Sequence, residues 1–200
     1  MLAPLAGAAC VSASLLAQSN AASTVNWPLH NLDLAGGRFS PMDQITTANV
    51  ATLTPRWLFQ TGVIDGVSNQ TTPVIVDGTM YVTDPRGSVY ALDAADGRLL
   101  WTYDVTNLIG GGAKAGYVFR NRGVCYADGV VYTAAGSFLF ALDAKSGTPI
   151  KTFGKDGQAS VILDVLKERY PDVIAAITLG YWFTTAPQIH DGVVYIGTTR

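Results

Sequence analysis

Short apolar runs interrupted by Asp-Gly dominate the chain from residue 71 onward. The runs VIVDGTMYV at 74–82 and VCYADGVVYT at 124–133 are rich in β-branched and aromatic residues. Each is interrupted by Asp-Gly, a dipeptide that accepts the positive φ angles of a tight hairpin. A second turn then leads into a third apolar run, VYALDA in the first case and LFALDA in the second. The pattern predicts consecutive antiparallel strands.

The same arrangement recurs along the chain. Residues 71–104 align with residues 121–154, and in each copy we expect a last strand, ending at Trp101 in the first and near Phe153 in the second. A third copy begins at residue 184 with TTAPQIHDGVVYIGTTR. Repeats of about forty to fifty residues with four strands each are typical of a β-propeller. The sequence therefore predicts an all-β fold, a β-propeller of four-stranded antiparallel blades, with about three blades present.

The third repeat lies farther along the chain than a regular spacing would place it. Successive Asp-Gly turns are 51 residues apart from Asp77 to Asp128 and 63 residues apart from Asp128 to Asp191. Residues 159–183 carry apolar side chains at helical spacing around a break at Pro171. They predict a helical insert near 159–179, which either shapes a pocket at one mouth of the propeller or only packs against the blades.

The first 22 residues differ from the rest in composition. They are rich in Ala, Leu and Ser, and are too short and too interrupted for a membrane span. They resemble the apolar core of a secretory signal with small residues near a cleavage site at 19–21, although no basic residue precedes Arg38. We therefore expect a secretory signal segment at 1–22 and a periplasmic location. Because a propeller closes with about four to eight blades, residues 23–200 are expected to be the N-terminal part of an incomplete propeller.

Composition narrows the classes of function. The chain is 48% hydrophobic and 14% charged, with a formal net charge of −2, so it has no basic surplus that would suit a nucleic acid. Cys10 would leave with the signal segment, and Cys125 would remain as a buried thiol without a disulfide partner or a zinc cluster. The aspartates Asp33, Asp65, Asp84 and Asp164 stand in turn or helix contexts that suggest capping and solvation.

The segment between the signal and the repeats carries a more specific pattern. Residues 43–53 predict a short helix, Pro55 a break, and residues 56–62 a strand. Trp27, then GGRFSP, DQI, NV and a Trp-x-Phe-x-Thr-Gly run occur in this order. Together they resemble the start of the pyrroloquinoline quinone (PQQ) dependent alcohol and glucose dehydrogenases, which are eight-bladed periplasmic propellers. The resemblance extends from residue 27 to residue 200.

The resemblance also explains the repeated ALDA phrase. Blades of this family close on Ala-x-Asp-x-x-x-Gly-x-x-x-Trp, in which the tryptophan wedges between blades and the Ala and Gly make room for it. The first copy matches in full, and the second matches at Ala141, Asp143 and Gly147 but has Lys151 in place of the tryptophan. The resemblance implies that the junction at Lys151 is less well packed.

Site residues follow from the same resemblance. PQQ is a tricarboxylated orthoquinone, so its site needs an arginine and several hydroxyl or amide donors near the propeller axis. The family's cofactor contacts correspond here to Gln70, Arg122, Thr184 and Thr199. Gln70 stands where many members have a glutamate, and its amide can still donate and accept.

Two departures limit what the resemblance implies. Many alcohol-oxidising members have two adjacent cysteines where this chain has Gly116 and Tyr117. Tyr117 either stacks on the quinone in their place or belongs to a surface loop. The glutamate that binds the calcium, or lanthanide, ion follows the position of Thr199 in the family, and the catalytic aspartate comes much later. We therefore expect no metal ligand and no catalytic residue within these 200 residues.

The function implied is the N-terminal part of a periplasmic PQQ-dependent dehydrogenase, inactive as a fragment. It would oxidise an alcohol, a polyol or a sugar and pass electrons to a quinone such as ubiquinone or to a cytochrome c. The alternative is a non-catalytic propeller scaffold of the outer-membrane protein assembly type, which shares the blade motif and the export signal. Such scaffolds lack the arginine and the GGRFSP segment, so these two features favour the enzyme.

Overall fold

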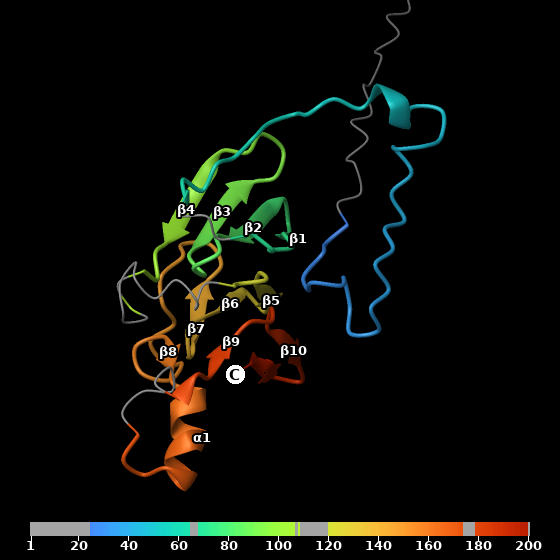
Figure 1. Cartoon of the computed structure of the whole chain (residues 1–200). Helices are drawn as coiled ribbons and strands as arrows, with labels where there is room; N and C mark the ends of the chain where they lie inside the picture. Colours follow the sequence, from blue (N-terminus) through green and yellow to red (C-terminus); the bar gives the residue numbers. More distant parts are fainter. Residues whose placement is uncertain (1–24, 65–67, 107, 109–119, 174–178, 200) are drawn as a thin grey trace, which may run out of the picture.

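Two four-stranded antiparallel sheets form the centre of the molecule (Figure 1). The computed structural model describes residues 25–64, 68–106, 108, 120–173 and 179–199. Each sheet contains its strands in sequence order, as expected for a propeller blade. The first blade consists of β1 (Val74–Val76), β2 (Thr79–Thr83), β3 (Val89–Asp93) and β4 (Leu99–Tyr103), and the second of β5 (Cys125–Ala127), β6 (Val130–Ala135), β7 (Phe138–Asp143) and β8 (Gln158–Ala159). The predicted four-stranded blades are confirmed in these two units.

The third repeat forms two short antiparallel pairs. Strand β10 (Gln188–His190) pairs with β11 (Val193–Tyr195), and β9 (Trp182–Phe183) pairs with β12 (Thr198–Thr199). As in the first two blades, the tight hairpin turn is an Asp-Gly pair with positive φ at both residues, 47° at Asp191 and 74° at Gly192. These angles match the type I′ turn that suits the twist of a hairpin.

A tryptophan joins the first blade to the second. The Trp101 indole donates from Nε1 to the Ala144 carbonyl at 3.0 Å, and its ring lies flat against Gly147. A Cβ atom on Gly147 would come within 2.5 Å of that ring, so only glycine leaves the required space. The wedge role expected for the blade-motif tryptophan is confirmed at this junction. The core between the blades consists of Val74, Val76, Tyr81, Val89, Ala91, Val124, Val131, Leu142 and Ala144.

The outer edge of the second blade differs from the prediction. We expected its last strand to end near Phe153, but β8 lies at residues 158–159. The chain touches β7 at Pro149, where Ile150 donates to the Ala141 carbonyl, and then loops away. It returns at Gly157, whose carbonyl accepts from Ala141, and continues into β8. Because Pro149 has no N–H to donate to a strand ladder, the strand is interrupted there.

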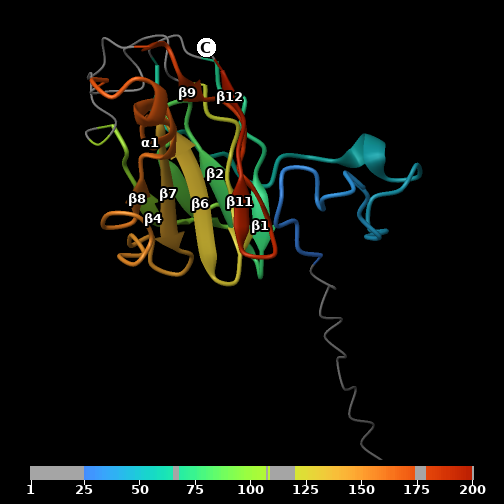
Figure 2. The ribbon, with the colours of Figure 1, turned by 90° about the horizontal axis from the view of Figure 1, so that it is seen from below.

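The N-terminal arm, residues 31–64, is less regular than predicted. Its only helical turn is the 3₁₀ helix η1 (Val50–Thr52), which covers three residues of the segment 43–53 where we expected a short helix. The Asn49 side chain accepts from Thr46 N and donates to the Gln44 carbonyl, and such local bonds compete with a helix. The expected strand at 56–62 is also absent from the described ranges, since no strand lies beside it. The part of the arm around η1 extends away from the sheets (Figure 2), whereas Trp57 and Phe59 contact the first blade.

The helical insert is confirmed over its first half. Helix α1 (Val161–Arg169) ends just before Pro171, and Ile162 packs with Ala134, Leu139 and Phe183. Residues 174–178, in the second half of the insert, lie outside the described residues, as does the expected signal segment at 1–22. No helix in the described ranges combines the length and the apolar character needed to cross a bilayer.

Candidate functional site

The first strands of the three repeats begin at the same end of the molecule. Thr72, just before β1, forms a parallel bridge with Gly123, just before β5, and the Thr72 amide donates to the Arg122 carbonyl at 3.3 Å. Strand β10 packs beside β5 on the other side. The segments that precede β1, β5 and β10 are therefore neighbours in space, and they carry three of the predicted site residues.

Arg122 and Thr184 are brought into direct contact. The Arg122 guanidinium donates from Nη1 to the Thr184 main-chain carbonyl at 2.5 Å, across the junction between the second and third repeats. Both residues are half-buried. Among the described residues, this carbonyl is the only hydrogen-bond acceptor of the guanidinium, and no carboxylate lies within 4.0 Å of it. A half-buried cation without a counter-charge is suited to an anionic ligand.

The other described site residues, Gln70 and Thr199, lie in the segments next to this contact. Gln70 is exposed and stands two residues before Thr72. Thr199 pairs with Trp182 across the β9–β12 ladder. Trp182 stands two residues before Thr184 in the sequence, so Thr199 lies near Thr184. Tyr117 lies outside the described residues, as does its neighbour Gly116. The structure thus groups Gln70, Arg122, Thr184 and Thr199 at one end of the blades, while their roles as ligands remain predictions.

A buried polar cluster beside Arg122 was missed by the sequence analysis. The Asn121 side chain is only 5% exposed, and its Oδ1 accepts from Thr83 Oγ1 at 2.6 Å and from Gly123 N at 2.7 Å. Its Nδ2 donates to the Ala134 carbonyl at 2.5 Å. The signal that could have found it is positional. Gln70, Asn121 and Thr184 each stand seven residues before the aspartate of an Asp-Gly turn.

The turn between β2 and β3 of the first blade also binds Asn121. The main-chain N–H of Asn121 donates to the Pro85 carbonyl at 3.2 Å. Asp84 organises the turn by accepting from the amides of Arg86, Gly87 and Ser88 at 2.8–3.0 Å. Burial raises the pKa of the Asp84 carboxyl above its ordinary value, against the opposing effect of these hydrogen bonds. The capping expected for this aspartate is confirmed, but the solvation expected with it is wrong, because Asp84 is only 3% exposed.

Cys125 and the acidic side chains of the described residues do not form a reactive thiol site or a metal site. The Cys125 thiol is buried, as expected, and burial raises its pKa to about 12. No group of three or more His, Cys, Asp or Glu side chains that could hold a metal ion occurs in the part of the chain that the structure describes.

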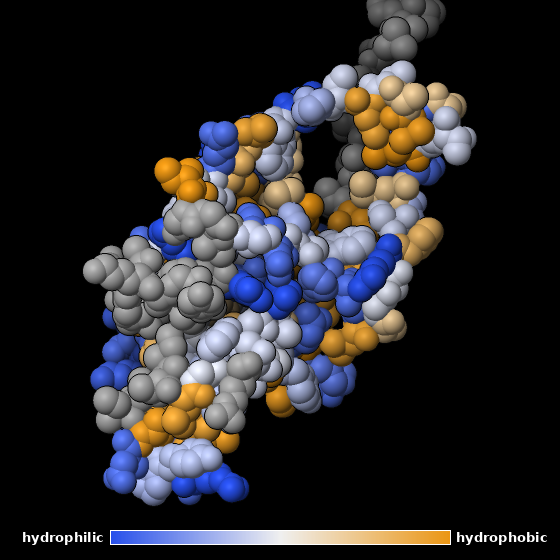
Figure 3. Space-filling view, viewed as in Figure 1, coloured by the Kyte–Doolittle hydropathy of each residue, from blue (hydrophilic) through white to orange (hydrophobic). Residues whose placement is uncertain are grey.

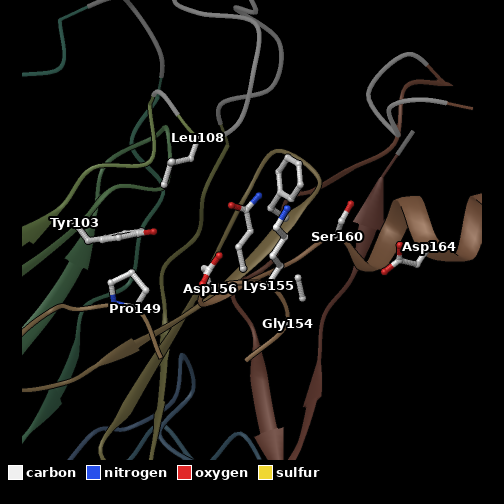
Figure 4. Close-up of a pocket in the computed structure, with 11 residues that line it drawn as sticks. Tyr103, Leu108, Pro149, Gly154, Lys155, Asp156, Ser160 and Asp164 are labelled. Carbon is white, nitrogen blue, oxygen red and sulfur yellow. The ribbon is translucent and has the colours of Figure 1, made fainter. Parts of the chain in front are cut away.

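One described cavity lies away from Arg122. It has a volume of about 790 Å³ and is open to solvent between the outer strands of the first two blades and α1. Tyr103 and Pro149 lie on one side of it and Ser160 and Asp164 on the other, with Lys155 between them (Figure 4). The insert contributes Ser160 and Asp164 to this cavity, and none of the predicted site residues that the structure describes, Gln70, Arg122, Thr184 and Thr199, lines it.

Comparison with known proteins identifies a single family. Residues 27–200 match the family described as PQQ, the glucose/ethanol/alcohol dehydrogenase beta-propeller domain. The chain is 33% identical over 194 residues to a 1-butanol dehydrogenase (cytochrome c) from Thauera butanivorans, covering 96% of this chain and 25% of that protein. It is 40% identical over 134 residues to a quinohemoprotein alcohol dehydrogenase from Comamonas testosteroni, covering 66% of this chain and 19% of that protein.

The fold agrees with these sequence matches. A solved quinohemoprotein alcohol dehydrogenase from Pseudomonas putida superposes with a TM-score of 0.66 at 33% identity, covering 87% of this chain and 23% of that one. The chain therefore spans about a quarter of the length of the relatives that it matches over most of its own length.

Proposed function

Because the chain belongs to the PQQ family of glucose, ethanol and alcohol dehydrogenase propellers, we propose that it forms the N-terminal part of a dehydrogenase that oxidises an alcohol, a polyol or a sugar. Relatives that carry names of this kind include the 1-butanol dehydrogenase and a quinoprotein glucose dehydrogenase from Escherichia coli. The family match favours this function over the scaffold alternative.

The observation that supports a PQQ site in this chain is the burial of the Arg122 guanidinium together with its few partners. Its guanidinium is half-buried, uses one acceptor, and has no carboxylate partner among the described residues. A tricarboxylated ligand supplies the missing negative charge and accepts the remaining N–H donors in charge-assisted hydrogen bonds. The residues present therefore fit the cofactor that the family uses.

Each site residue has a distinct part in this proposal. When bound, PQQ supplies the two-electron chemistry by accepting a hydride or its equivalent from the alcohol carbon. Arg122 binds a cofactor carboxylate and is oriented by the Thr184 carbonyl. The hydroxyls of Thr184 and Thr199 and the side-chain amide of Gln70 would donate hydrogen bonds to the cofactor. Tyr117, which lies outside the described residues, would stack on the quinone.

The remaining features of the whole protein are proposed from its relatives. The metal would be calcium or a lanthanide, with ligands beyond residue 200, and would polarise the quinone. A lanthanide-dependent methanol dehydrogenase from Methylorubrum extorquens is 36% identical over 153 residues. Electrons pass to a cytochrome c or to a quinone, acceptors that stand in the names of two relatives. We also propose a periplasmic location, with residues 1–22 as the export signal.

The test is a PQQ titration of the protein expressed from its whole reading frame, with calcium present. Arg122→Ala should raise the dissociation constant of PQQ by about tenfold to a hundredfold, since a hydrogen bond to a charged group contributes roughly 1.5–3 kcal/mol. Arg98→Ala is the matched control, because Arg98 is exposed and pairs with Asp93 of the first blade. An unchanged PQQ affinity in the Arg122 variant would remove this site from the proposal.

A further inference from the structure

We infer that Asn121 is a positioning residue, which fixes the main chain of Arg122 so that the guanidinium points toward Thr184 and the ligand. This inference rests on the proposed function, because it assigns Arg122 a ligand to bind. It adds a residue to which neither the blade motif nor the resemblance to the family gives a role.

Asn121 is bonded on every side. Its Oδ1 accepts from Thr83 Oγ1 of the first blade, and its Nδ2 donates to the Ala134 carbonyl of the second. Its main-chain amide donates to Pro85 in the turn between β2 and β3. One side chain therefore links two blades and a turn, and a buried amide whose donor and acceptor are both satisfied holds a single orientation.

The bonds of Asn121 restrict the residue that follows it. Oδ1 also accepts from Gly123 N at 2.7 Å. The Asn121 side chain therefore bridges over Arg122 and binds the main chain of the residue that follows it. Gly123 has a φ of 119°, and a Cβ there would come within 2.8 Å of the Thr72 carbonyl oxygen. The Arg122 carbonyl is itself held by the Thr72 amide. With the main chain fixed at 121, 122 and 123, the side chain of Arg122 starts from a defined position.

The other two repeats show that a propeller blade does not need this arrangement. The positions equivalent to Asn121 are Gln70, which is exposed, and Thr184, which is half-buried. Among the repeats that the structure describes, the buried amide occurs in the one that carries the arginine. Burying an amide costs free energy unless it is fully bonded, so a purely structural position would be filled as well by an apolar residue. The link to Arg122 explains why position 121 is occupied by an asparagine rather than by an apolar residue.

The test is a double-mutant cycle on PQQ affinity in the whole protein. Asn121→Ala should raise the dissociation constant at least tenfold, but in the Arg122→Ala background the same change should add less than twofold, because Asn121 acts through the arginine. Tyr81→Phe is the matched control. It removes another buried bond between the same two blades, from Tyr81 Oη to the Ala144 carbonyl, and should leave the affinity within twofold of the parent.

Two outcomes would overturn the inference: an unchanged affinity in Asn121→Ala, or losses that multiply fully in the double variant. If Asn121→Ala does not fold, Thr83→Val removes one donor to Oδ1 and should give a smaller, about threefold, loss with the same dependence on Arg122. A second measurement needs no PQQ. The rate at which phenylglyoxal modifies Arg122, followed by peptide mapping, should rise several-fold in Asn121→Ala and stay unchanged in Tyr81→Phe.

These measurements separate the two proposals. If the parent protein does not bind PQQ, the proposed function is wrong, and the modification rate still decides whether Asn121 positions Arg122. If the parent binds PQQ but the modification rate and the affinity are both unaffected by Asn121→Ala, the proposed function stands and the positioning role is wrong.

Discussion

At the scale of single residues, burial decides which polar groups are available for chemistry. Asp84 is almost fully buried and accepts three amides of its own turn, and Tyr90 donates to its other oxygen at 3.3 Å. Arg122, by contrast, is a half-buried cation that donates to one acceptor among the described residues and keeps further N–H groups for a ligand. The two side chains belong to one end of the molecule, but only Arg122 is arranged to bind an incoming group.

The raised pKa of Asp84 leads to a prediction about pH. Since burial raises its pKa in the folded state above the ordinary 3.8, the folded protein binds this proton more tightly than the unfolded chain does. The resulting stability is complete below pH 3.8 and is lost as the pH rises through the folded-state pKa. Asp84→Asn lacks this loss, so its free energy of unfolding relative to the parent should increase from acidic to neutral pH in urea titrations.

Asp104 provides a control of opposite sign. Hydrogen bonds, first from Thr106, lower its pKa, so it contributes stability above its unfolded-state pKa that is lost as the pH falls through the folded-state value. Asp104→Asn should therefore lose stability relative to the parent as the pH rises. If the free energy of unfolding of both variants changes with pH in parallel with that of the parent, neither carboxyl titrates as described.

Cys125 should be chemically inert in the folded protein. Burial raises its pKa from 9.0 to about 12, which lowers the thiolate fraction about a thousandfold, and burial also blocks access to the sulfur. Peptide mapping after iodoacetamide treatment should find Cys125 unmodified in the native protein and fully modified in urea. Rapid native labelling would show that the strand β5 opens readily.

Sequence reasoning at this scale found Arg122 but not the residue beside it. The resemblance gave roles to Gln70, Arg122 and Thr184 because they match known contacts. Asn121 and Thr83 look like ordinary loop and strand residues in the sequence. Only the folded structure shows that both are buried and bonded to each other, since the two belong to different repeats.

At the scale of elements, the turns were predictable and the outer strand of the second blade was not. Asp-Gly dictates a hairpin locally, through its tolerance of positive φ, and all three turns formed as expected. The outer strand depends on which segment returns to β7, and that is decided by Pro149 and by the loop that follows. A local apolar pattern near Phe153 carried no information on this tertiary choice.

The blade junction gives a prediction with a matched control. Gly147→Ala should lose roughly 2–5 kcal/mol, because its φ of 71° disfavours a side chain and the new Cβ would collide with Trp101. Gly129→Ala has a similar φ of 80° but nothing within 4 Å, so it should lose only about 1–2 kcal/mol. Urea unfolding of both variants measures the difference. Equal losses would mean that Trp101 moves aside at no cost.

At the scale of the whole molecule, the arm behaves as part of a further blade. Trp57 donates from Nε1 to the Ala94 carbonyl at 3.2 Å and covers Gly97, just as Trp101 binds Ala144 and covers Gly147. Residues 56–62 thus dock on the first blade as the outer strand of a preceding blade would. The arm also exposes large apolar side chains, 72% of Phe39 and 96% of Ile64 among them, and apolar surface gathers around η1 (Figure 3).

Trp57 should therefore contribute as much to the stability of the whole protein as Trp101 does. Trp57→Ala and Trp101→Ala should each lower the free energy of unfolding by about 2–4 kcal/mol, somewhat less than a fully buried tryptophan would cost. Urea unfolding of the two variants, with Leu58→Ala at an exposed position as the control, tests this equivalence. A negligible loss in Trp57→Ala would show that the arm is not part of the ring.

The bond between Arg122 and Thr184 has a consequence for how the protein can change over evolutionary time. The guanidinium meets the third repeat through a peptide carbonyl, which every amino acid at position 184 would supply. Sequence drift at 184 can thus alter the hydroxyl offered to a ligand while the arginine keeps its anchor. Position 122 has no such freedom, so the same contact tolerates substitution on one side and forbids it on the other.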